Sequence, residues 1–431
     1  MLYPNLDINE NGHLTMAGQD TCDLADTYGT PLLLMDEQAV RQRCRVYLQA
    51  MQEAFPEGSL PLFASKALSI KALYRIMKEE GMGVDVSSPG ELYTALKSGF
   101  PMDRVYFHGN NKTDADIRLA MESGLGYFIC DNADELSAIN AEAGRRGIRQ
   151  KILLRLTPGI DPHTHAKINT GRIDSKFGAA IETGQAEALI VMALKLPNVD
   201  LRGCHCHIGS QIFEHAPFCE AAEIMVKFLK EMEEKHGFHG EILNLGGGMA
   251  VPYTDKDPSI DYGKNIRSIG ILLKEACRKA GMAVPVILME PGRSIVADAG
   301  MTLYTVGGTK KIPGFKNYVS VDGGMADNPR YTLYQSDYTV LPADRMHDIP
   351  DFTCTVAGRC CESGDLIQEN VTLPEPSRGD KLAVLTTGAY NYSMASNYNR
   401  LPRPAVVMIG KDGPYVAVRR ESLDDLLRND L

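Results

Sequence analysis

Three short segments of the chain carry side chains that could act together in catalysis. Lys66 follows the apolar run 60–65, and an apolar strand end favours the neutral, nucleophilic form of an amine. Far downstream stand Glu290-Pro291-Gly292-Arg293 and Cys361-Glu362-Ser363-Gly364-Asp365. The Lys66 amine can hold a carbonyl cofactor. The second segment offers the Glu290 carboxylate and a backbone that could bind a phosphate, and the third offers a thiol beside two more carboxylates.

Strand and helix patterns alternate between residues 60 and 290. Amphipathic stretches such as 69–80, 90–98, 133–146 and 218–236 lie between β-rich runs. The eight runs are 61–65, 83–86, 105–107, 127–130, 151–156, 201–208, 241–245 and 286–289. This alternation predicts an α/β fold, a parallel (β/α)8 barrel of the TIM type whose crossovers run through helices.

Polar and glycine residues follow these runs closely. They are Lys66, Asp85, Ser87, His108, Arg155, His207, Ser210, Gly246-Gly247-Gly248 and Glu290 to Arg293. In a parallel barrel the carboxyl ends of the strands meet at one mouth, where active sites lie. The triple glycine favours both a turn and a phosphate site, since its N–H groups can approach phosphate oxygens without side-chain obstruction. The barrel mouth is therefore the predicted ligand site.

Cys204-His205-Cys206-His207 raises the alternative of a metal site. Successive residues of a strand point to opposite faces, so these four side chains cannot all converge on one ion. We predict buried thiols, one functional histidine and no metal.

The pattern changes after Arg293 to β-rich runs separated by Gly and Pro turns, at 301–306, 317–321, 352–357, 381–386, 405–409 and 415–418. We predict a barrel over 36–290, a mostly β C-terminal domain over 291–431, and an N-terminal segment, 1–35, that packs with the β domain. Residues 10–13 are interpreted as a tight hairpin turn.

Composition restricts the class of protein. The chain has 431 residues, of which 44% are hydrophobic, enough for a substantial core. A net charge of −10 argues against a general nucleic-acid or anionic-membrane surface. Ten cysteines without an export pattern indicate reduced thiols. We expect a cytoplasmic protein with no nucleic-acid or membrane partner.

Several blocks together resemble one enzyme family, the alanine-racemase-like pyridoxal phosphate decarboxylases, which act on diaminopimelate, ornithine or arginine. The matching blocks are Phe63-Ala64-Ser65-Lys66-Ala67, His205-Cys206-His207-Ile208-Gly209-Ser210-Gln211, Leu245-Gly246-Gly247-Gly248, Glu290-Pro291-Gly292-Arg293, Asp322-Gly323-Gly324-Met325, Asp327-Asn328-Pro329-Arg330, Cys361-Glu362-Ser363-Gly364-Asp365, Gly388-Ala389-Tyr390 and Ser393-Met394-Ala395-Ser396-Asn397-Tyr398-Asn399. They span the chain from residue 63 to about 400 in the family's order.

The resemblance implies a pyridoxal 5′-phosphate cofactor and its contacts. Lys66 matches the lysine that binds the cofactor covalently, and His207 matches the histidine that stacks on its ring. Glu290 matches the carboxylate that pairs with the ring nitrogen. The groups that match the phosphate-binding set are Ser210, Gly248, Gly292, Arg293 and Tyr390.

The reaction and the assembly follow from the same resemblance. A carboxylate at the ring nitrogen keeps it protonated and favours decarboxylation, whereas related racemases place an arginine there. Cys361 matches the residue that protonates the substrate α-carbon, and relatives supply it from the opposite subunit. The resemblance therefore implies a homodimer with shared active sites.

Substrate choice is implied by the residues that match the family's substrate-binding set, Arg293, Arg330, Tyr334, Glu362 and Tyr390. A guanidinium suits a distal carboxylate and would repel a bare cation, which favours meso-2,6-diaminopimelate, converted to L-lysine and CO2. Tyr331 and the pair Arg359-Cys360 depart from the family pattern beside these residues.

Other substrates and functions stay open on the sequence. The alternatives are decarboxylation of carboxynorspermidine, ornithine, lysine or arginine, a non-enzymatic pyridoxal phosphate-binding protein, and a metal-dependent barrel hydrolase. The mouth offers too few metal ligands for the last of these. A polar segment, 163–178, is a candidate lid.

Overall fold

The computed structural model describes residues 3–160 and 175–431. They divide into two compact units: the barrel unit holds Arg43–Ala250 and Ile260–Ser294, and the β unit holds Met1–Gln42, Val251–Ser259 and Ile295–Leu431. The domain bounds expected from the sequence, 1–35, 36–290 and 291–431, stay a prediction, because compactness alone does not show which parts fold independently.

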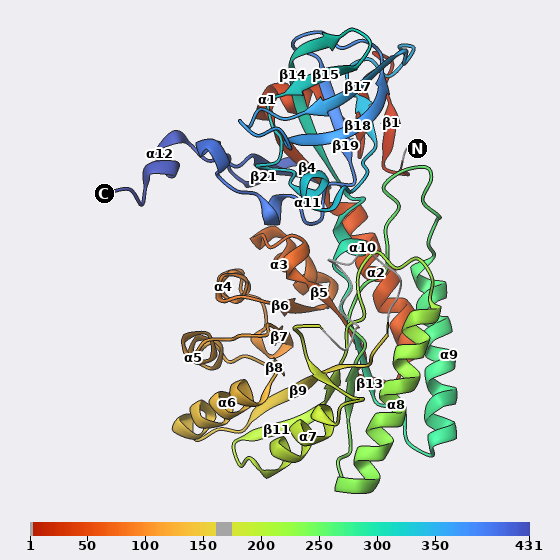
Figure 1. The fold of residues 1–431 in the computed structure, drawn as a ribbon, viewed down its shortest axis with the longest axis vertical. Coiled ribbons are helices and arrows are strands. Elements are labelled where there is room, and N and C mark those ends of the chain that lie inside the picture. The colour runs from red at the N-terminus through yellow and green to blue at the C-terminus, as the bar shows by residue number, and fades with distance from the viewer. Residues whose placement is uncertain (1–2, 161–174) are drawn as a thin grey trace. The chain divides into compact units, whose positions relative to one another are not determined.

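Parallel strands close into a barrel in the first unit (Figure 1). Around the ring the described strands are β5 (Leu60–Ala64), β6 (Gly83–Val86), β7 (Val105–Phe107), β8 (Tyr127–Cys130), β9 (Gln150–Thr157), β11 (Val199–His205), β12 (Ile242–Asn244) and β13 (Val286–Met289). Pairing of β8 with β9 and of β13 with β5 closes the ring. The predicted barrel is confirmed, and each predicted run matches a strand to within a few residues.

Helices surround these strands as crossovers (Figure 1). In the barrel unit they include α3 (Lys71–Glu80), α4 (Pro89–Lys97), α5 (Asp114–Glu122), α6 (Ala133–Arg146), α7 (Gln185–Lys195), α8 (Ala216–His236) and α9 (Tyr262–Ala280), and α2 (Glu37–Ala54) leads in from the β unit. Local sequence sets their ends: the Ser88 hydroxyl accepts from Glu91 N at the start of α4, and left-handed Gly147 ends α6.

The barrel interior is filled by side chains. Leu62, Tyr106, Ile129, Leu153, Ile242 and Leu288 form one buried cluster. Tyr106 and Tyr127 stack with ring centroids 4.7 Å apart. Because these residues alternate with outward-facing ones along each strand, the ring is a packed core and ligand chemistry is confined to its mouth.

The β unit is built around a sheet in the order β18-β17-β15-β14-β4-β20-β21, with β19 and β16 branching from β14. Its strands are β4 (Leu32–Asp36), β14 (Gly300–Ile312), β15 (Lys316–Val321), β16 (Val340–Pro342), β17 (Phe352–Ala357), β18 (Leu366–Leu373), β19 (Lys381–Leu385), β20 (Ala405–Gly410) and β21 (Gly413–Val418). The N-terminal strand β4 pairs with both β14 and β20, so the predicted joining of the N-terminal segment to the β domain is confirmed.

Short elements complete this unit. They are β1 (Leu6–Ile8), β2 (Leu14–Met16), β3 (Gln19–Asp20), α1 (Thr21–Tyr28), α11 (Arg330–Tyr334) and α12 (Leu423–Leu427). The short helix α10 (Arg293–Val296) begins in the barrel unit and ends in the β unit, and in the barrel unit β10 (Ala179–Ala180) pairs with β9. The predicted turn at residues 10–13 joins β1 to β2 as an antiparallel hairpin. Gly12 N donates to Asn9 O at 2.9 Å, which closes the turn. Within the described residues, no helix is long and apolar enough to cross a bilayer.

A buried ion pair ties the segment after β7 to α6. Lys112 Nζ lies 2.7 Å from Glu135 Oε1 and also donates to Gly109 O and Ile129 O at 2.9 and 2.8 Å. The two side chains are 1% and 3% exposed. Burial raises the pKa of Glu135, and the charge and hydrogen bond of Lys112 oppose that shift and stabilise the carboxylate.

We expect Lys112→Met to lower the free energy of unfolding by about 3–5 kcal/mol, because the Glu135 carboxylate is left buried without its cation. Urea denaturation measures this, with Lys230→Met in a partly exposed pair on α8 as the control that should change little. Adding Glu135→Leu should recover much of the loss. A single variant no less stable than the double would contradict this account.

Candidate active site

Three loops pack backbone against backbone at the carboxyl ends of β11, β12 and β13. Glu290 N donates to Gly246 O at 2.8 Å. A Cβ on Gly247 would lie 2.0 Å from Glu290 O, and one on Gly248 would lie 2.4 Å from Gly209 O. Gly248 also has a φ of 125°, which L-residues with side chains rarely adopt. Only glycine lets these loops approach so closely.

The other predicted phosphate ligands of the barrel unit meet at the same edge. Arg293 Nη2 donates to Ser210 Oγ at 3.1 Å. A Cβ on Gly292 would lie 2.9 Å from Ala64 Cβ, at the end of β5. Lys66 lies in the 3-10 turn that follows this strand. The structure therefore brings the predicted lysine and the predicted phosphate ligands of the barrel unit to one mouth of the barrel.

Glu290 is buried at this mouth, and each of its two oxygens receives a hydrogen bond. Asn244 Nδ2 donates to Oε1 at 2.7 Å, and His205 Nε2 bonds to Oε2 at 3.2 Å. His108 Nε2 lies 2.8 Å from Oε1. A carboxylate held this way is an acceptor suited to a protonated ring nitrogen.

The pKa values of two neighbouring buried carboxyl groups, Glu290 and Asp85, are shifted in opposite directions. Burial alone would raise the pKa of Glu290, but His108 and His205 outweigh it and hold that pKa well below the usual range. Asp85, at the end of β6 and 3.9 Å from His108 Nε2, is also buried. Its pKa is raised by burial and by the charge of Glu290, against the effect of His108. Glu290 is thus the ionised member of the pair and Asp85 is shifted toward its neutral form.

His207 is held as a neutral ring. Gly247 N donates to its Nδ1 at 3.2 Å, so this nitrogen carries no proton and the proton lies on Nε2. Burial, with the nearby positive charge of Lys66, keeps the pKa of His207 well below its usual value. A neutral imidazole beside the glycine loop is suited to cover the face of a flat aromatic ligand.

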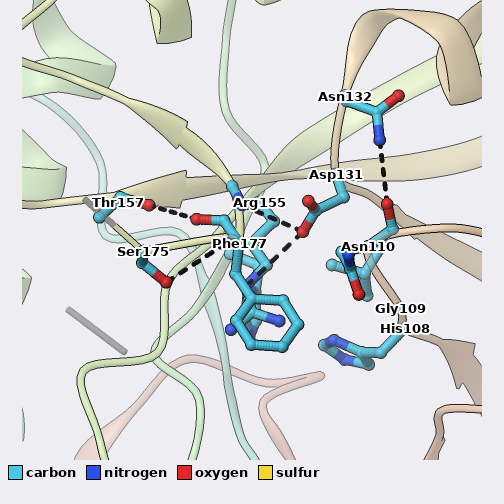
Figure 2. A network of polar contacts seen from close by, with 12 residues as sticks. His108, Gly109, Asn110, Asp131, Asn132, Arg155, Thr157, Ser175 and Phe177 are labelled. Atoms are coloured by element: carbon cyan, nitrogen blue, oxygen red, sulfur yellow. Dashed lines mark hydrogen bonds and ion pairs between the residues drawn. The ribbon is translucent and has the colours of Figure 1, made fainter. Parts of the chain in front are cut away.

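Arg155, at the end of β9, belongs to a second polar network beside His108 (Figure 2). Its Nε lies 4.0 Å from Asp131 Oδ1, and its guanidinium lies 4.3 Å from the Phe177 ring centroid. Phe177 O accepts from Thr157 Oγ1 at 2.8 Å. These contacts anchor residues 175–178 to β9, while residues 163–174 of the candidate lid lie outside the described residues.

In the β unit, Arg330, Tyr334 and Tyr390 come together. The Arg330 guanidinium lies 5.0 Å from the Tyr334 ring centroid and 5.6 Å from that of Tyr390. Arg330 is buried and its Nη2 donates to Ser336 Oγ at 3.3 Å. Tyr390 has a φ of 61°, a left-handed conformation that costs a non-glycine residue energy and is typical of functional positions. Three predicted substrate residues thus form one cluster.

Cys361 and Glu362 are exposed on a loop of the β unit. Asp365 fixes the base of that loop: it is buried, and its two oxygens accept from Met325 N at 2.5 Å and from Cys360 N at 2.7 Å. The thiol predicted to transfer a proton is therefore presented at the surface by a rigid turn.

The departures from the family pattern have local partners. Tyr331 OH donates to Glu369 Oε2 at 2.6 Å, and Glu369 also pairs with Lys316. Arg359 N donates to Gly323 O at 2.9 Å. Both departures are thus tied to strands or loops of the β unit.

Two sets of potential metal ligands occur among the described residues: His13, Asp20 and Cys22, and His108, His205 and Glu290. Hydrogen bonds and ion pairs within each set already use its carboxylate, so we assign no metal to either. His205 entered the sequence argument as part of a metal run and of a matching block, without a role of its own, and Asn244 was missed. Its signal was its place as the last residue of β12, separated from the glycines by Leu245 alone.

The residues present fit pyridoxal 5′-phosphate. The close-packed glycines leave a cradle without side chains beside Ser210 and Arg293, as a phosphate requires, and an ionised carboxylate stands at the same mouth. Residues 39–297 match the model of the pyridoxal-dependent decarboxylase family for its pyridoxal-binding domain. Fold and site thus define a pyridoxal phosphate-dependent decarboxylase, which confirms the predicted cofactor.

Comparison with known proteins identifies one family within the pyridoxal phosphate-dependent decarboxylases. The chain is 44% identical over 423 residues to diaminopimelate decarboxylase of Bacillus subtilis, covering 98% of this chain and 96% of that protein. It is 42% identical over 423 residues to the Staphylococcus aureus enzyme of the same name, covering 98% of each. The crystal structure of M. jannaschii diaminopimelate decarboxylase with L-lysine superposes with a TM-score of 0.93 at 34% identity, covering 100% of this chain and 99% of that one. The chain belongs to the diaminopimelate decarboxylase family.

Proposed function

We propose that this protein decarboxylates meso-2,6-diaminopimelate to L-lysine and CO2, the last step of lysine biosynthesis. We infer the type of reaction from Glu290. This carboxyl group is buried, and His108 and His205 hold its pKa low against the effect of burial. Pyridoxal phosphate, when bound, supplies an electron sink for the pair left by departing CO2, and a carboxylate at the ring nitrogen strengthens that sink by keeping the nitrogen protonated.

The barrel residues hold the cofactor in this proposal. Lys66 binds it covalently through Nζ, His207 covers one face of its ring, and Glu290 accepts from its ring nitrogen. The phosphate-binding groups are Ser210, Gly248, Gly292, Arg293 and Tyr390. Support comes from the convergence of the barrel members of this set at one mouth.

Substrate choice rests on charge at the far end of the ligand. Arg330 presents a guanidinium between two tyrosine rings, where it suits a carboxylate and disfavours a bare ammonium. Arg293 and Tyr390 also contact the substrate, and Glu362 receives the distal ammonium. Ornithine, lysine and arginine end in a cation without a carboxylate and would leave Arg330 unpaired.

We infer that the active enzyme is a homodimer with shared sites. Cys361 donates a proton from Sγ to the substrate α-carbon, and together with Glu362 it is supplied by the opposite subunit. Exposure of both side chains in the single chain supports this. A buried acid would be confined to its own chain, whereas an exposed one can serve a partner.

We further propose a cytoplasmic location. All ten cysteines are free thiols, and nine of them are buried. A chain that keeps this many cysteines unpaired suits a reducing compartment.

The proposal is tested by measuring CO2 release from the purified protein with pyridoxal phosphate. The substrates are meso-diaminopimelate, carboxynorspermidine, ornithine, lysine and arginine, each offered alone. We expect release from meso-diaminopimelate, with the three cation-ended substrates at least about 100-fold slower in kcat/KM, because a buried group would lose its partner. Release mainly from another substrate would overturn the assignment of Arg330, and silence from all five would favour a non-enzymatic binder.

A further inference from the structure

Glu290 is oriented by two side chains to which the proposed reaction assigns no contact with cofactor or substrate, His205 and Asn244. His205 and Asn244 are the last residues of β11 and β12, and both are 0% exposed. They approach different oxygens of the carboxylate, Asn244 at Oε1 and His205 at Oε2. Two donors on two oxygens fix the plane of a carboxylate as well as its position.

Asn244 also connects Glu290 to the glycine loop. Its Oδ1 accepts from Gly246 N at 2.9 Å, while its Nδ2 donates to Glu290 at 2.7 Å. An N–H requires an oxygen and a carboxylate requires a donor, so these two contacts fix which way the amide points. One side chain therefore couples the proposed ring-nitrogen partner to the proposed phosphate loop.

The protonation of His205 follows from its partners. Nε2 faces a carboxylate, which accepts only, so Nε2 carries the proton. Nδ1 is buried and makes no hydrogen bond to any described residue. The His108 ring meets that of His205 edge to face at 4.8 Å, so His205 is confined on this side as well. The ring is a neutral donor aimed at one oxygen.

We propose that His205 and Asn244 are positioning residues, which hold the Glu290 carboxylate in the plane and charge state that the cofactor's ring nitrogen requires. The inference rests on the proposed role of Glu290. Without the two donors the carboxylate could turn or take up the ring proton, and the protonated nitrogen would lose its partner. The binding energy that depends on that nitrogen should then fall, while contacts to the phosphate should stay unchanged.

The test compares apoenzyme affinity for pyridoxal phosphate and for its 1-deaza analogue, in which a C–H replaces the ring nitrogen. We expect His205→Leu to weaken pyridoxal phosphate binding about tenfold, the loss typical of one hydrogen bond to a charged group, and deaza binding less than about twofold. Asn244→Asp should do the same, because it keeps the acceptor for Gly246 N but removes the donor to Glu290. Cofactor fluorescence quenching measures both affinities.

Three further variants make the outcome decisive. Cys204→Ala, a buried change on the same strand, should alter neither affinity. His205→Gln keeps an N–H near the position of Nε2 and should restore at least part of the selective loss. Glu290→Gln calibrates the method: if it fails to distinguish the two cofactors, the proposed role of Glu290 is wrong. If it does distinguish them, an equal loss for both cofactors, or no loss, in His205→Leu and Asn244→Asp overturns the positioning role.

Discussion

Replacing Lys66 with alanine should reduce kcat for CO2 release by about 10³-fold or more, because the amine that binds the cofactor is lost. Lys66 stands directly beyond β5, at the mouth where Ser210, Gly292 and Arg293 gather. Without its amine the cofactor has no covalent attachment and is held by non-covalent contacts alone. The variant protein should therefore lose pyridoxal phosphate on dialysis, and borohydride should no longer fix the cofactor to the peptide that contains residue 66.

Two comparisons separate this chemical role from a structural one. Lys71→Ala removes an exposed lysine at the start of α3 and should retain full activity. Added methylamine should partly restore activity to Lys66→Ala, because a small primary amine can take the place of the missing Nζ. Undiminished borohydride labelling of Lys66→Ala would show that another residue binds the cofactor.

Barrel topology could be predicted because its signals are local. Each strand from β5 to β13 that forms the ring is a short apolar run, and each is followed by polar or glycine residues that a parallel barrel must bring to one edge. The β unit was harder to predict. β18 has an irregular burial pattern, and β4 lies near the N-terminus, far in sequence from the strands β14 and β20 that it joins. The packing of the N-terminal segment with the β domain was predicted, but period-2 patterning does not show which strands pair over such a distance.

Some residues of the site could likewise be predicted from local sequence, and others could not. Lys66, Ser210 and Glu290 stand in recognisable blocks at strand ends, and their convergence followed from topology. The contacts of Asn244 and His205 with Glu290 could not be predicted, because they depend on which side chains lie across the barrel from one another. The sequence argument excluded a metal role for the run that contains His205 but gave this histidine no other role, and the structure shows a carboxylate opposite its Nε2. The ionised state of Glu290 likewise depends on neighbours from two other strands.

If active sites are shared between subunits as proposed, two inactive variants should restore each other. Cys361→Ala should lower kcat about 100-fold, since it removes a proton donor, and Lys66→Ala should lower it further. In a mixed dimer of the two, one site would combine both defects and the other would be intact. After random exchange of subunits from an equal mixture, about half of the dimers are mixed, so about a quarter of wild-type activity should return.

The fraction of activity that returns depends on whether Cys361 acts in the site of its own chain or in that of the opposite subunit. The mixing experiment therefore distinguishes these two arrangements. If Cys361 served the site of its own chain, a mixed dimer would hold one site without Lys66 and one without Cys361, and no activity would return. Mixing Lys66→Ala with Lys66→Arg is the matched control, since no pairing of these chains rebuilds a site. Exposure of Cys361 and Glu362 on the loop fixed by Asp365 favours restoration, because the single chain presents both side chains at its surface. Mixed dimers that form but stay inactive would place the proton donor within one subunit and remove the main reason for a shared site.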